Sequence, residues 1–343
     1  MRKVFVTCPA YLATGGTELL HQLVYKLINT FKIDAYIFYP NVQKGLDTHP
    51  TPTKFVKYIG NNWVEKLDDS SNQILIVPET TPTIINTYNK TELWIWWLSI
   101  DNFFLNLGTG ISYKTYIKPN LKWKIIRLLN LKPYKKLNEY LNTLSSKQNI
   151  KIHLYQSEYA NLFLQTLGVK AINPLSDYID QSLINKHSDK IDNRLDQVLY
   201  NPAKGFEITS QLIKTFPEIK WVPIAKMTSE EISNLMASSK VYLDFGNHPG
   251  KDRLPREAAL NGCCIIVNKE GAANNNLDIN IPEKFKINNP IKEQSLIISL
   301  IKETFKFYKN QYLQFEDYRS KIRKEEYTFE TEVRHLVKSI MLR

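Results

Sequence analysis

The sequence predicts an α/β protein made of two Rossmann-like βαβ domains with parallel sheets. Its length of 343 residues is typical of two domains. Short apolar runs rich in β-branched residues alternate with segments of helical periodicity in both halves, as in proteins with parallel sheets. Glycine or proline turns follow several of these runs, as they do in βαβ units. The hydrophobic content of 43% is ordinary for a folded globular protein.

The N-terminal segment supplies the first βαβ unit. Residues 3–8 form a strand-like run that leads into a turn containing two glycines. Apolar residues at helical spacing predict a helix over residues 18–30, with Thr17 as its N-cap. A second strand is expected at residues 34–39. Strand, turn, helix and strand in this order predict a parallel strand pair.

Three further buried strands are expected in the first half, at residues 73–77, 93–98 and 150–155, and the last of them is expected to end the first domain. Glu79 follows the first of these strands and Asp101 follows the second. The carboxyl ends of parallel strands form the edge at which α/β sheets bind ligands. Either carboxylate is therefore a candidate general base for a substrate hydroxyl. Helix capping by one and an ion pair for the other are alternatives that stay open.

One segment carries most of the net charge of +11. Residues 113–136 contain eight Lys or Arg and no acidic residue, which leaves +3 for the rest of the chain. A helix is expected over residues 120–130, with apolar and basic residues on partly separate faces. The residues expected at its binding surface are Lys118, Lys122, Trp123, Lys124 and Arg127. Three interpretations stay open: binding to an anionic membrane, packing of the apolar stripe on the domain, and binding of RNA.

The second half begins after a crossing between domains at residues 173–178, and the polar residues 181–196 are expected to form a surface excursion. Its predicted elements are strands at 197–200 and 220–223, helices at 206–215 and 227–238, and terminal helices at 291–309 and 313–340. Lys204 and the glycine after it open the first of these helices. The acidic first turn of the second helix suits the helix dipole.

The stretch from 241 to 275 is the most informative part of the chain. A strand at 241–244 leads into a loop punctuated by Gly and Pro, then a short helix and a second strand at 263–267. Backbone N–H groups at the start of that helix, together with Lys251, Arg253 and Arg256, favour an anion such as phosphate. Glu257, one turn into the helix, is placed to accept hydrogen bonds from hydroxyl groups beside the phosphate. A phosphate next to a diol describes a nucleotide sugar.

This strand, the helix with Glu257-Ala-Ala, the Gly-Cys turn and the later Gly-Ala-Ala loop resemble the donor site of GT-B glycosyltransferases, especially the retaining Leloir group. That group has a Glu-x7-Glu motif, whose second Glu holds the ribose and corresponds to Glu257. Pro249 stands in place of the first Glu, which normally touches the donor sugar. Lys204 resembles the lysine that grips the donor diphosphate, although Leu199 stands where the family has an Arg.

The resemblance implies a two-domain arrangement around a central cleft. Residues 1–173 would form the N-terminal acceptor-side domain and residues 174–312 the donor domain. Residues 313–343 would contain a helix that returns to the first domain. The glycine pair of the first βαβ unit would face the cleft, and the loop after the strand at 220–223 would lie near the nucleobase.

The residues expected to bind the donor are Gly15, Gly16, Lys204, Pro223, His248, Gly250, Lys251, Asp252, Arg253 and Glu257. The catalytic candidates are Asp101, Glu79, Lys204 and Arg253. The chain contains no Asp-x-Asp motif, so basic residues and a helix end are expected to stabilise the leaving diphosphate. No metal and no other cofactor is therefore expected.

These expectations describe a cytoplasmic glycosyltransferase that moves a sugar from a nucleotide donor to a surface glycan or glycolipid, with a slight preference for retention. Three cysteines without zinc-like spacing and no signal-like N-terminus favour the cytoplasm, with an anionic inner membrane face as a partner of the basic segment. A sugar-nucleotide epimerase of the same fold is one alternative. A basic nucleic-acid-binding protein is another, but the clustering of the charges in one segment disfavours it, so no nucleic-acid partner is expected.

Overall fold

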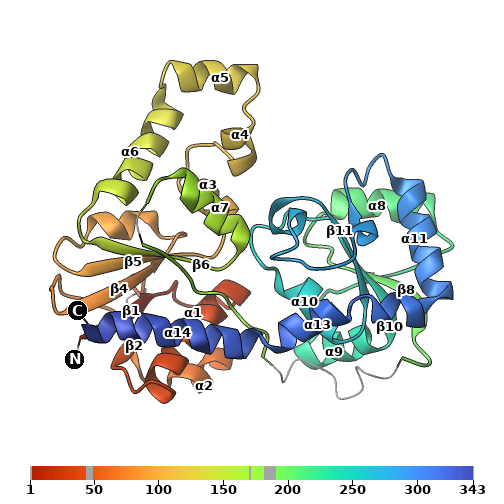
Figure 1. Ribbon diagram of the computed structural model, residues 1–343, viewed down its shortest axis with the longest axis horizontal. Helices are drawn as coiled ribbons and strands as arrows, with labels where there is room; N and C mark the ends of the chain where they lie inside the picture. The colour runs from red at the N-terminus through yellow and green to blue at the C-terminus, as the bar shows by residue number, and fades with distance from the viewer. Residues whose placement is uncertain (1, 44–48, 170, 181–190, 343) are drawn as a thin grey trace. The chain divides into compact units, whose positions relative to one another are not determined.

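The computed structural model describes residues 2–43, 49–169, 171–180 and 191–342. They form two compact units (Figure 1): unit 1 comprises Met1–Asp177 and Tyr327–Arg343, and unit 2 comprises Tyr178–Glu326. The domain boundaries expected at 173/174 and 312/313 lie earlier in the chain than these divisions. Most of the surface excursion expected at 181–196 falls outside the described residues.

Unit 1 is built on a seven-stranded parallel sheet with the strand order β3-β2-β1-β4-β5-β6-β7. Its strands are β1 (Lys3–Thr7), β2 (Ala35–Phe38), β3 (Trp63–Val64), β4 (Gln73–Pro78), β5 (Glu92–Trp97), β6 (Ile150–Tyr155) and β7 (Ile172–Pro174). The predicted parallel sheet is confirmed. The expectation that β6 ends the first domain is wrong, because β7 adds a further strand within the residues that were expected to form the crossing.

The helices of unit 1 are α1 (Gly15–Asn29), α2 (Val56–Ile59), α3 (Ile100–Asn106), α4 (Tyr113–Ile117), α5 (Leu121–Leu128), α6 (Lys132–Ser146) and α7 (Glu158–Thr166). Helix α1 begins earlier than predicted. Thr14, not Thr17, is its N-cap, and the two threonines form a capping box with reciprocal hydrogen bonds. Gly15 and Gly16 therefore belong to the first helical turn, and the turn from β1 ends before them.

Strand β5 explains why one stretch contains three tryptophans. The strand is internal to the sheet and all of its residues are buried. Each indole N–H finds an acceptor: Glu92 Oε1 for Trp94, the Leu175 carbonyl for Trp96 and His153 Nδ1 for Trp97. Burial of large aromatic groups on both faces of the strand, with their N–H groups satisfied, stabilises the centre of unit 1.

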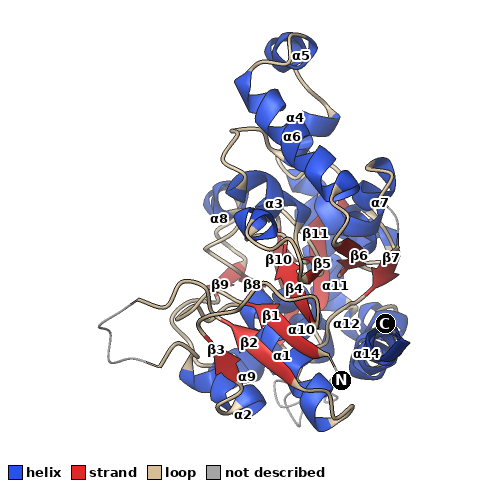
Figure 2. Ribbon diagram, turned by 90° about the vertical axis from the view of Figure 1, so that its left-hand side faces the viewer, coloured by secondary structure: helices blue, strands red, loops and turns tan. Residues whose placement is uncertain are grey.

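Helices α4, α5 and α6 form an excursion between β5 and β6 that rises away from the sheet, with α5 at its tip (Figure 1, Figure 2). Helix α5 matches the predicted basic helix closely, whereas α6 was not predicted. Within the described residues, no helix is long and apolar enough to cross a bilayer.

The C-terminal residues are divided into three short helices and a longer one. These are α11 (Gln294–Lys306), α12 (Tyr308–Leu313), α13 (Glu316–Arg323) and α14 (Glu325–Leu342). From Tyr327 onward α14 belongs to unit 1, where Lys26 of α1 lies 3.5 Å from Glu330 and the Ser176 hydroxyl donates to Glu332 at 2.7 Å. The single helix expected over 313–340 is therefore interrupted, because α13 packs in unit 2 against α10 (Arg253–Leu260).

Unit 2 has a five-stranded parallel sheet in the order β12-β11-β10-β8-β9. Its remaining elements are β8 (Leu195–Tyr200), β9 (Lys220–Pro223), β10 (Ser239–Asp244), β11 (Cys264–Asn268), β12 (Lys286–Ile287), α8 (Phe206–Thr215) and α9 (Ser229–Ala237). Strands β8, β10 and β11 lie next to one another, so the loops after them share one edge of the sheet.

Candidate active site

Three loops meet at the carboxyl edge of the unit 2 sheet. The loop after β8 carries Lys204, the loop after β10 carries His248 and Asp252, and β11 ends at Asn268. Strands β10 and β11 are paired in parallel with Asp244 opposite Val267, so the loops that follow them lie side by side. The site is therefore made from three segments, of which the first and the last lie 64 residues apart in the sequence.

Two glycines allow the first two of these loops to approach closely. Gly205 has a φ of +65°, and a Cβ atom there would lie 2.4 Å from the backbone carbonyl of Phe245. A Cβ at Gly246 would lie 2.2 Å from Cγ of Lys204. The stem of Lys204 therefore crosses directly over Gly246, a contact that sequence reasoning missed.

The third loop is joined to the second in the same manner. Ala272 N donates to the His248 carbonyl at 2.8 Å. A Cβ at Gly271, whose φ is +54°, would overlap that carbonyl oxygen. Close contacts made possible by glycines thus join all three loops.

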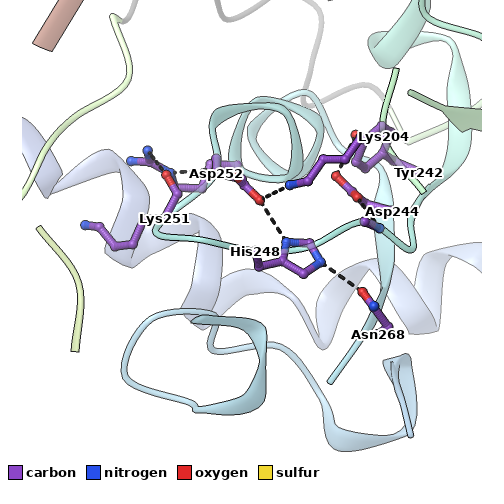
Figure 3. A network of polar contacts seen from close by, with 9 residues as sticks. Lys204, Tyr242, Asp244, His248, Lys251, Asp252 and Asn268 are labelled. Atoms are coloured by element: carbon purple, nitrogen blue, oxygen red, sulfur yellow. Dashed lines mark hydrogen bonds and ion pairs between the residues drawn. The ribbon is translucent and has the colours of Figure 1, made fainter. Parts of the chain in front are cut away.

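A polar network runs across the three loops (Figure 3). Lys204 Nζ lies 2.5 Å from Asp252 Oδ2, and His248 Nδ1 lies 2.9 Å from the same oxygen. On the other side of its ring, His248 Nε2 is 3.1 Å from Asn268 Oδ1. The His248 side chain is completely buried, so both ring nitrogens depend on these partners. Lys204, His248 and Asp252 were predicted site residues, and the structure brings them together.

Asp252 is the N-cap residue of α10, but its side chain does not cap the helix. An N-cap side chain normally accepts from the N–H of the second or third helical residue. The third residue here is Pro255, which has no N–H, so one of the two usual donors is missing. Burial would raise the pKa of Asp252, but the His248 hydrogen bond and the Lys204 charge outweigh it and lower that pKa. The carboxylate is therefore ionised beside the lysine.

Asp244, His248 and Asp252 are the only described residues that offer at least three grouped metal-ligand atoms, all within 4.8 Å of one another. Their atoms have protein partners, however. Asp244 accepts from Gly246 N at 3.0 Å and from the Tyr242 hydroxyl at 3.1 Å. Oδ2 of Asp252 is held by Lys204. A cation that bound through this oxygen would have to displace that ammonium group.

Lys251 and Arg256 do not point at this network, contrary to the expectation that their charges converge there. Both side chains bind Glu325, at 3.3 and 2.7 Å respectively, and Figure 3 shows Lys251 extending away from Asp252. Arg256 is only 1% exposed and also donates to the backbone carbonyls of Lys251 and Asp252. These charges hold α10 in unit 2, and a ligand-binding role for them has little geometric support.

Arg253 and Glu257 lie one helical turn apart on α10, with Nε 3.4 Å from Oε1. Both side chains are partly accessible, at 23% and 14% exposure. Gly250 is buried within the same loop, and Pro223 is exposed at the end of the edge strand β9. The arginine, the carboxylate and Lys204 therefore offer charged and hydrogen-bonding groups from α10 and the loop after β8.

In unit 1, Gly15 and Gly16 open α1 after β1. A Cβ at Gly16 would meet Leu98 Cδ1 only at 3.9 Å, an ordinary van der Waals distance. Neither glycine is among the residues with positive φ. The backbone of the described residues therefore gives no local reason for glycine here, and their predicted part in donor binding stays a prediction.

Glu79 and Asp101 follow the adjacent parallel strands β4 and β5, as predicted. Glu79 is 2% exposed, and its Oε2 accepts from Leu98 N at 2.8 Å. Burial raises the pKa of Glu79 from 4.5 to about 8. A carboxyl that is enclosed and largely protonated at neutral pH is a poor general base. Asp101 is partly exposed in the first turn of α3, where the Tyr159 hydroxyl donates to it at 3.4 Å.

No family model and no curated protein sequence matches the chain. Solved structures do match: HepE of Anabaena in complex with UDP-glucose has a TM-score of 0.62 at 10% identity, covering 99% of this chain and 100% of that one. Sucrose-phosphate synthase of Thermosynechococcus elongatus has a TM-score of 0.64 at 9% identity over 100% of both chains. The fold is GT-B.

TarM is similar to the same extent, with a TM-score of 0.64 at 10% identity over 99% of each chain. The GT-B fold confirms the fold class that the motif resemblance implied. Three residues of the polar network, Tyr242, Asp244 and Asn268, were not predicted as site residues. Of these, Asp244 had a sequence signal, because it is the last residue of the strand expected at 241–244 and the carboxyl ends of parallel strands bind ligands.

Proposed function

We propose that this chain is a glycosyltransferase that takes a sugar from a nucleotide-sugar donor bound in unit 2. The observation that carries the proposal is the position of Lys204, whose ammonium group stands at the junction of the loops after β8 and β10. An ammonium group at the carboxyl edge of a parallel sheet is well placed to bind a diphosphate. Glu257, one turn into α10, would bind the ribose hydroxyls, and Arg253 would add a second positive charge.

Similar structures support this choice of donor. HepE was solved with UDP-glucose, and a TarM variant was solved with UDP. For this chain we propose a nucleotide sugar without naming the base or the sugar. Pro249 takes the place of the carboxylate that the family resemblance would put beside the donor sugar, so the sugar contacts must come from other groups.

A thermal-shift panel of nucleotides and nucleotide sugars tests the donor site. A ligand at about 100 times its dissociation constant adds about 2.7 kcal/mol to the free energy of unfolding. We expect one nucleotide family to stabilise the wild type, and Lys204→Ala and Glu257→Ala to lose that stabilisation. Lys302→Ala is the matched control, because Lys302 forms an exposed ion pair with Glu218 in the same unit. Stabilisation that persists in both site variants would place the nucleotide elsewhere.

We further propose a hydroxyl of a surface glycan or glycolipid as the acceptor. Asp101 is the better candidate for an acceptor-side base, since it is accessible and Glu79 is not. Transfer with retention of configuration is favoured by the likeness of Lys204 and Glu257 to the retaining group. Anomeric NMR of the product separates the two outcomes, and an inverted product would contradict the preference for retention.

We propose that the transfer needs no metal ion, because Lys204 already pairs with Asp252, one of the three residues grouped as possible metal ligands. Activity should therefore survive treatment with EDTA and should not rise on addition of Mg²⁺ or Mn²⁺. A loss of activity that only a divalent ion restores would overturn this part of the proposal.

The excursion α4–α6 supports a place at an anionic membrane surface. Leu121, Ile125 and Leu128 share one face of α5 and are 73%, 49% and 85% exposed. Three lysines that flank them are exposed as well, namely Lys118, Lys122 and Lys124. An apolar face bordered by lysines fits the interface between acyl chains and anionic headgroups. We propose that this surface holds the enzyme at a membrane that carries its acceptor.

A further inference from the structure

Lys204 already has an anionic partner within its own chain. This partner is Asp252, whose Oδ2 lies 2.5 Å from Lys204 Nζ. The same oxygen also accepts a hydrogen bond from His248 Nδ1. The side chains of Lys204 and Asp252 are only 25% and 23% exposed. Partial burial strengthens the attraction between such charges. A diphosphate that approaches Lys204 thus meets a neutral pair and not a free cation.

The Asp252 carboxylate contacts Lys204 and His248 but does not hold the helix that it precedes. It does not cap α10, and Pro255 removes one of the donors that it would cap. The start of α10 is instead held by the Arg256 guanidinium, which binds the backbone carbonyls of Lys251 and Asp252 and pairs with Glu325. The side chain of Asp252 is therefore free to serve the network around Lys204.

Resting on the donor site proposed above, we infer that Asp252 is a stand-in anion, which occupies Lys204 while the site is empty and is replaced by diphosphate oxygens when the donor binds. The exchange replaces one ion pair with another, so Lys204 keeps an anionic partner throughout. His248 continues to donate to the carboxylate after Lys204 leaves it, and Asn268 holds the other side of the imidazole ring.

The stand-in anion affects both the binding of the donor and the release of the nucleotide. Its negative charge competes with the diphosphate of the donor and with that of the released nucleotide. Asp252 therefore lowers the affinity for both, and a lowered affinity for the leaving nucleotide favours its release. A residue that only positioned Lys204 would have the opposite effect, since its removal would weaken diphosphate binding.

Isothermal titration with inorganic pyrophosphate and with UDP distinguishes these roles. The proteins are the wild type, Asp252→Asn, Lys204→Ala and the matched control Asp196→Asn. Asp196 also lies 2.5 Å from a lysine, Lys240, but in a more exposed pair on another part of unit 2. We expect Asp252→Asn to bind pyrophosphate about tenfold more tightly or better, a gain worth about 1.4 kcal/mol. Asp196→Asn should change the affinity for pyrophosphate less than twofold. Lys204→Ala should not bind pyrophosphate.

Equal or weaker pyrophosphate binding by Asp252→Asn would overturn the stand-in role. The proposed function would survive that result if the wild type bound a nucleotide through Lys204. If neither the wild type nor Asp252→Asn bound pyrophosphate or a nucleotide, both the stand-in role and the proposed function would be overturned. If Asp252→Asn does not give a cooperative melt, Asp252→Gly takes its place with the same two outcomes, because glycine is tolerated at N-caps and no side-chain cap is lost.

Discussion

The Glu79 carboxyl lies at the edge where parallel sheets bind ligands, yet it is enclosed by its own strand ends. One oxygen accepts from Leu98 N, and the other has no hydrogen-bond partner among the described residues. Burial raises its pKa from 4.5 to about 8. The native state therefore holds a proton that the unfolded state has lost between these two pH values, and stability must fall as the pH rises through this range.

Glu79→Gln should remove this pH dependence, because glutamine keeps an acceptor for Leu98 N without a titrating group. The gain in the free energy of unfolding should be small at pH 5 and on the order of a few kcal/mol at pH 8. Urea unfolding at both pH values measures it. Glu218→Gln, at an exposed ion pair, is the control and should show no such growth. An equal effect of Glu79→Gln at the two pH values would contradict the raised pKa of Glu79.

Gly205 should tolerate no side chain. Its φ of +65° is unfavourable for other residues, and an added Cβ would collide with the Phe245 backbone. Gly205→Ala should lower the free energy of unfolding by more than the ~1–3 kcal/mol of backbone strain alone. Gly168→Ala isolates the strain, because its φ is +62° and no atom lies within 4 Å of the added Cβ. Equal melting temperatures for the two variants would argue against the close approach of the loops.

Gly246→Ala should act on ligand binding more than on stability. Its added Cβ would collide with the flexible stem of Lys204 and not with backbone, so the side chain can move aside. Moving the ammonium group should weaken pyrophosphate binding by about tenfold or more, since a charge-assisted contact to phosphate is worth about 1.5–3 kcal/mol. Titration calorimetry measures the affinity. Unchanged binding would show that Lys204 can bind pyrophosphate without its side chain crossing Gly246.

At the scale of elements, helix α5 separates the interpretations of the basic segment. Trp123 was expected at the binding surface, but its ring lies 6.2 Å from that of Tyr134 and is partly buried. Ile126 likewise packs against the unit 1 core. Packing on the domain therefore explains one side of the helix. It does not explain Leu121, Ile125 and Leu128, which remain exposed on the other side.

Sedimentation with vesicles containing phosphatidylserine tests the membrane proposal. Lys118→Gln/Lys122→Gln/Lys124→Gln should reduce binding about a hundredfold, since each basic residue near an anionic surface contributes about 1 kcal/mol. The matched control carries the same change at three exposed lysines of unit 2, Lys214, Lys220 and Lys226. Equal loss in both proteins would indicate a nonspecific charge effect, and no loss in either would refute the membrane role of α5.

At the scale of the whole molecule, three buried titrating groups make the stability of unit 1 depend on pH. Burial lowers the pKa of His21 and of His153 from 6.5 to about 4, so stability is lost as the pH falls between these values. Glu79 acts in the opposite direction between 4.5 and 8. Below pH 6.5 the two histidines have the larger effect, so stability rises with pH. Above pH 6.5 only the Glu79 carboxyl still titrates, so stability falls.

Unit 1 should therefore be most stable near pH 6.5 within the range 4.5 to 8. Thermal melts at intervals of half a pH unit would locate the maximum. In Glu79→Gln the decline above pH 6.5 should disappear, whereas the decline toward pH 4.5 should become steeper. A maximum at pH 5 or below would mean that the two imidazoles are not buried in their neutral forms.

The sequence by itself determined the parallel α/β architecture and the presence of His248, Asp252 and Glu257 around one helix start, with Lys204 before another. Strands and turns are local, so periodicity, β-branched runs and glycines are sufficient to predict them. The family resemblance then led from these patches to the GT-B fold, although no family model matches the sequence.

Only the tertiary structure decided where the charges go. Lys251 and Arg256 look equivalent to Arg253 along the loop, but Glu325, about seventy residues later, binds them both. The burial of Glu79 likewise depends on contacts between distant segments. A side chain's partner and its exposure arise from long-range packing, and no local pattern in the sequence records them.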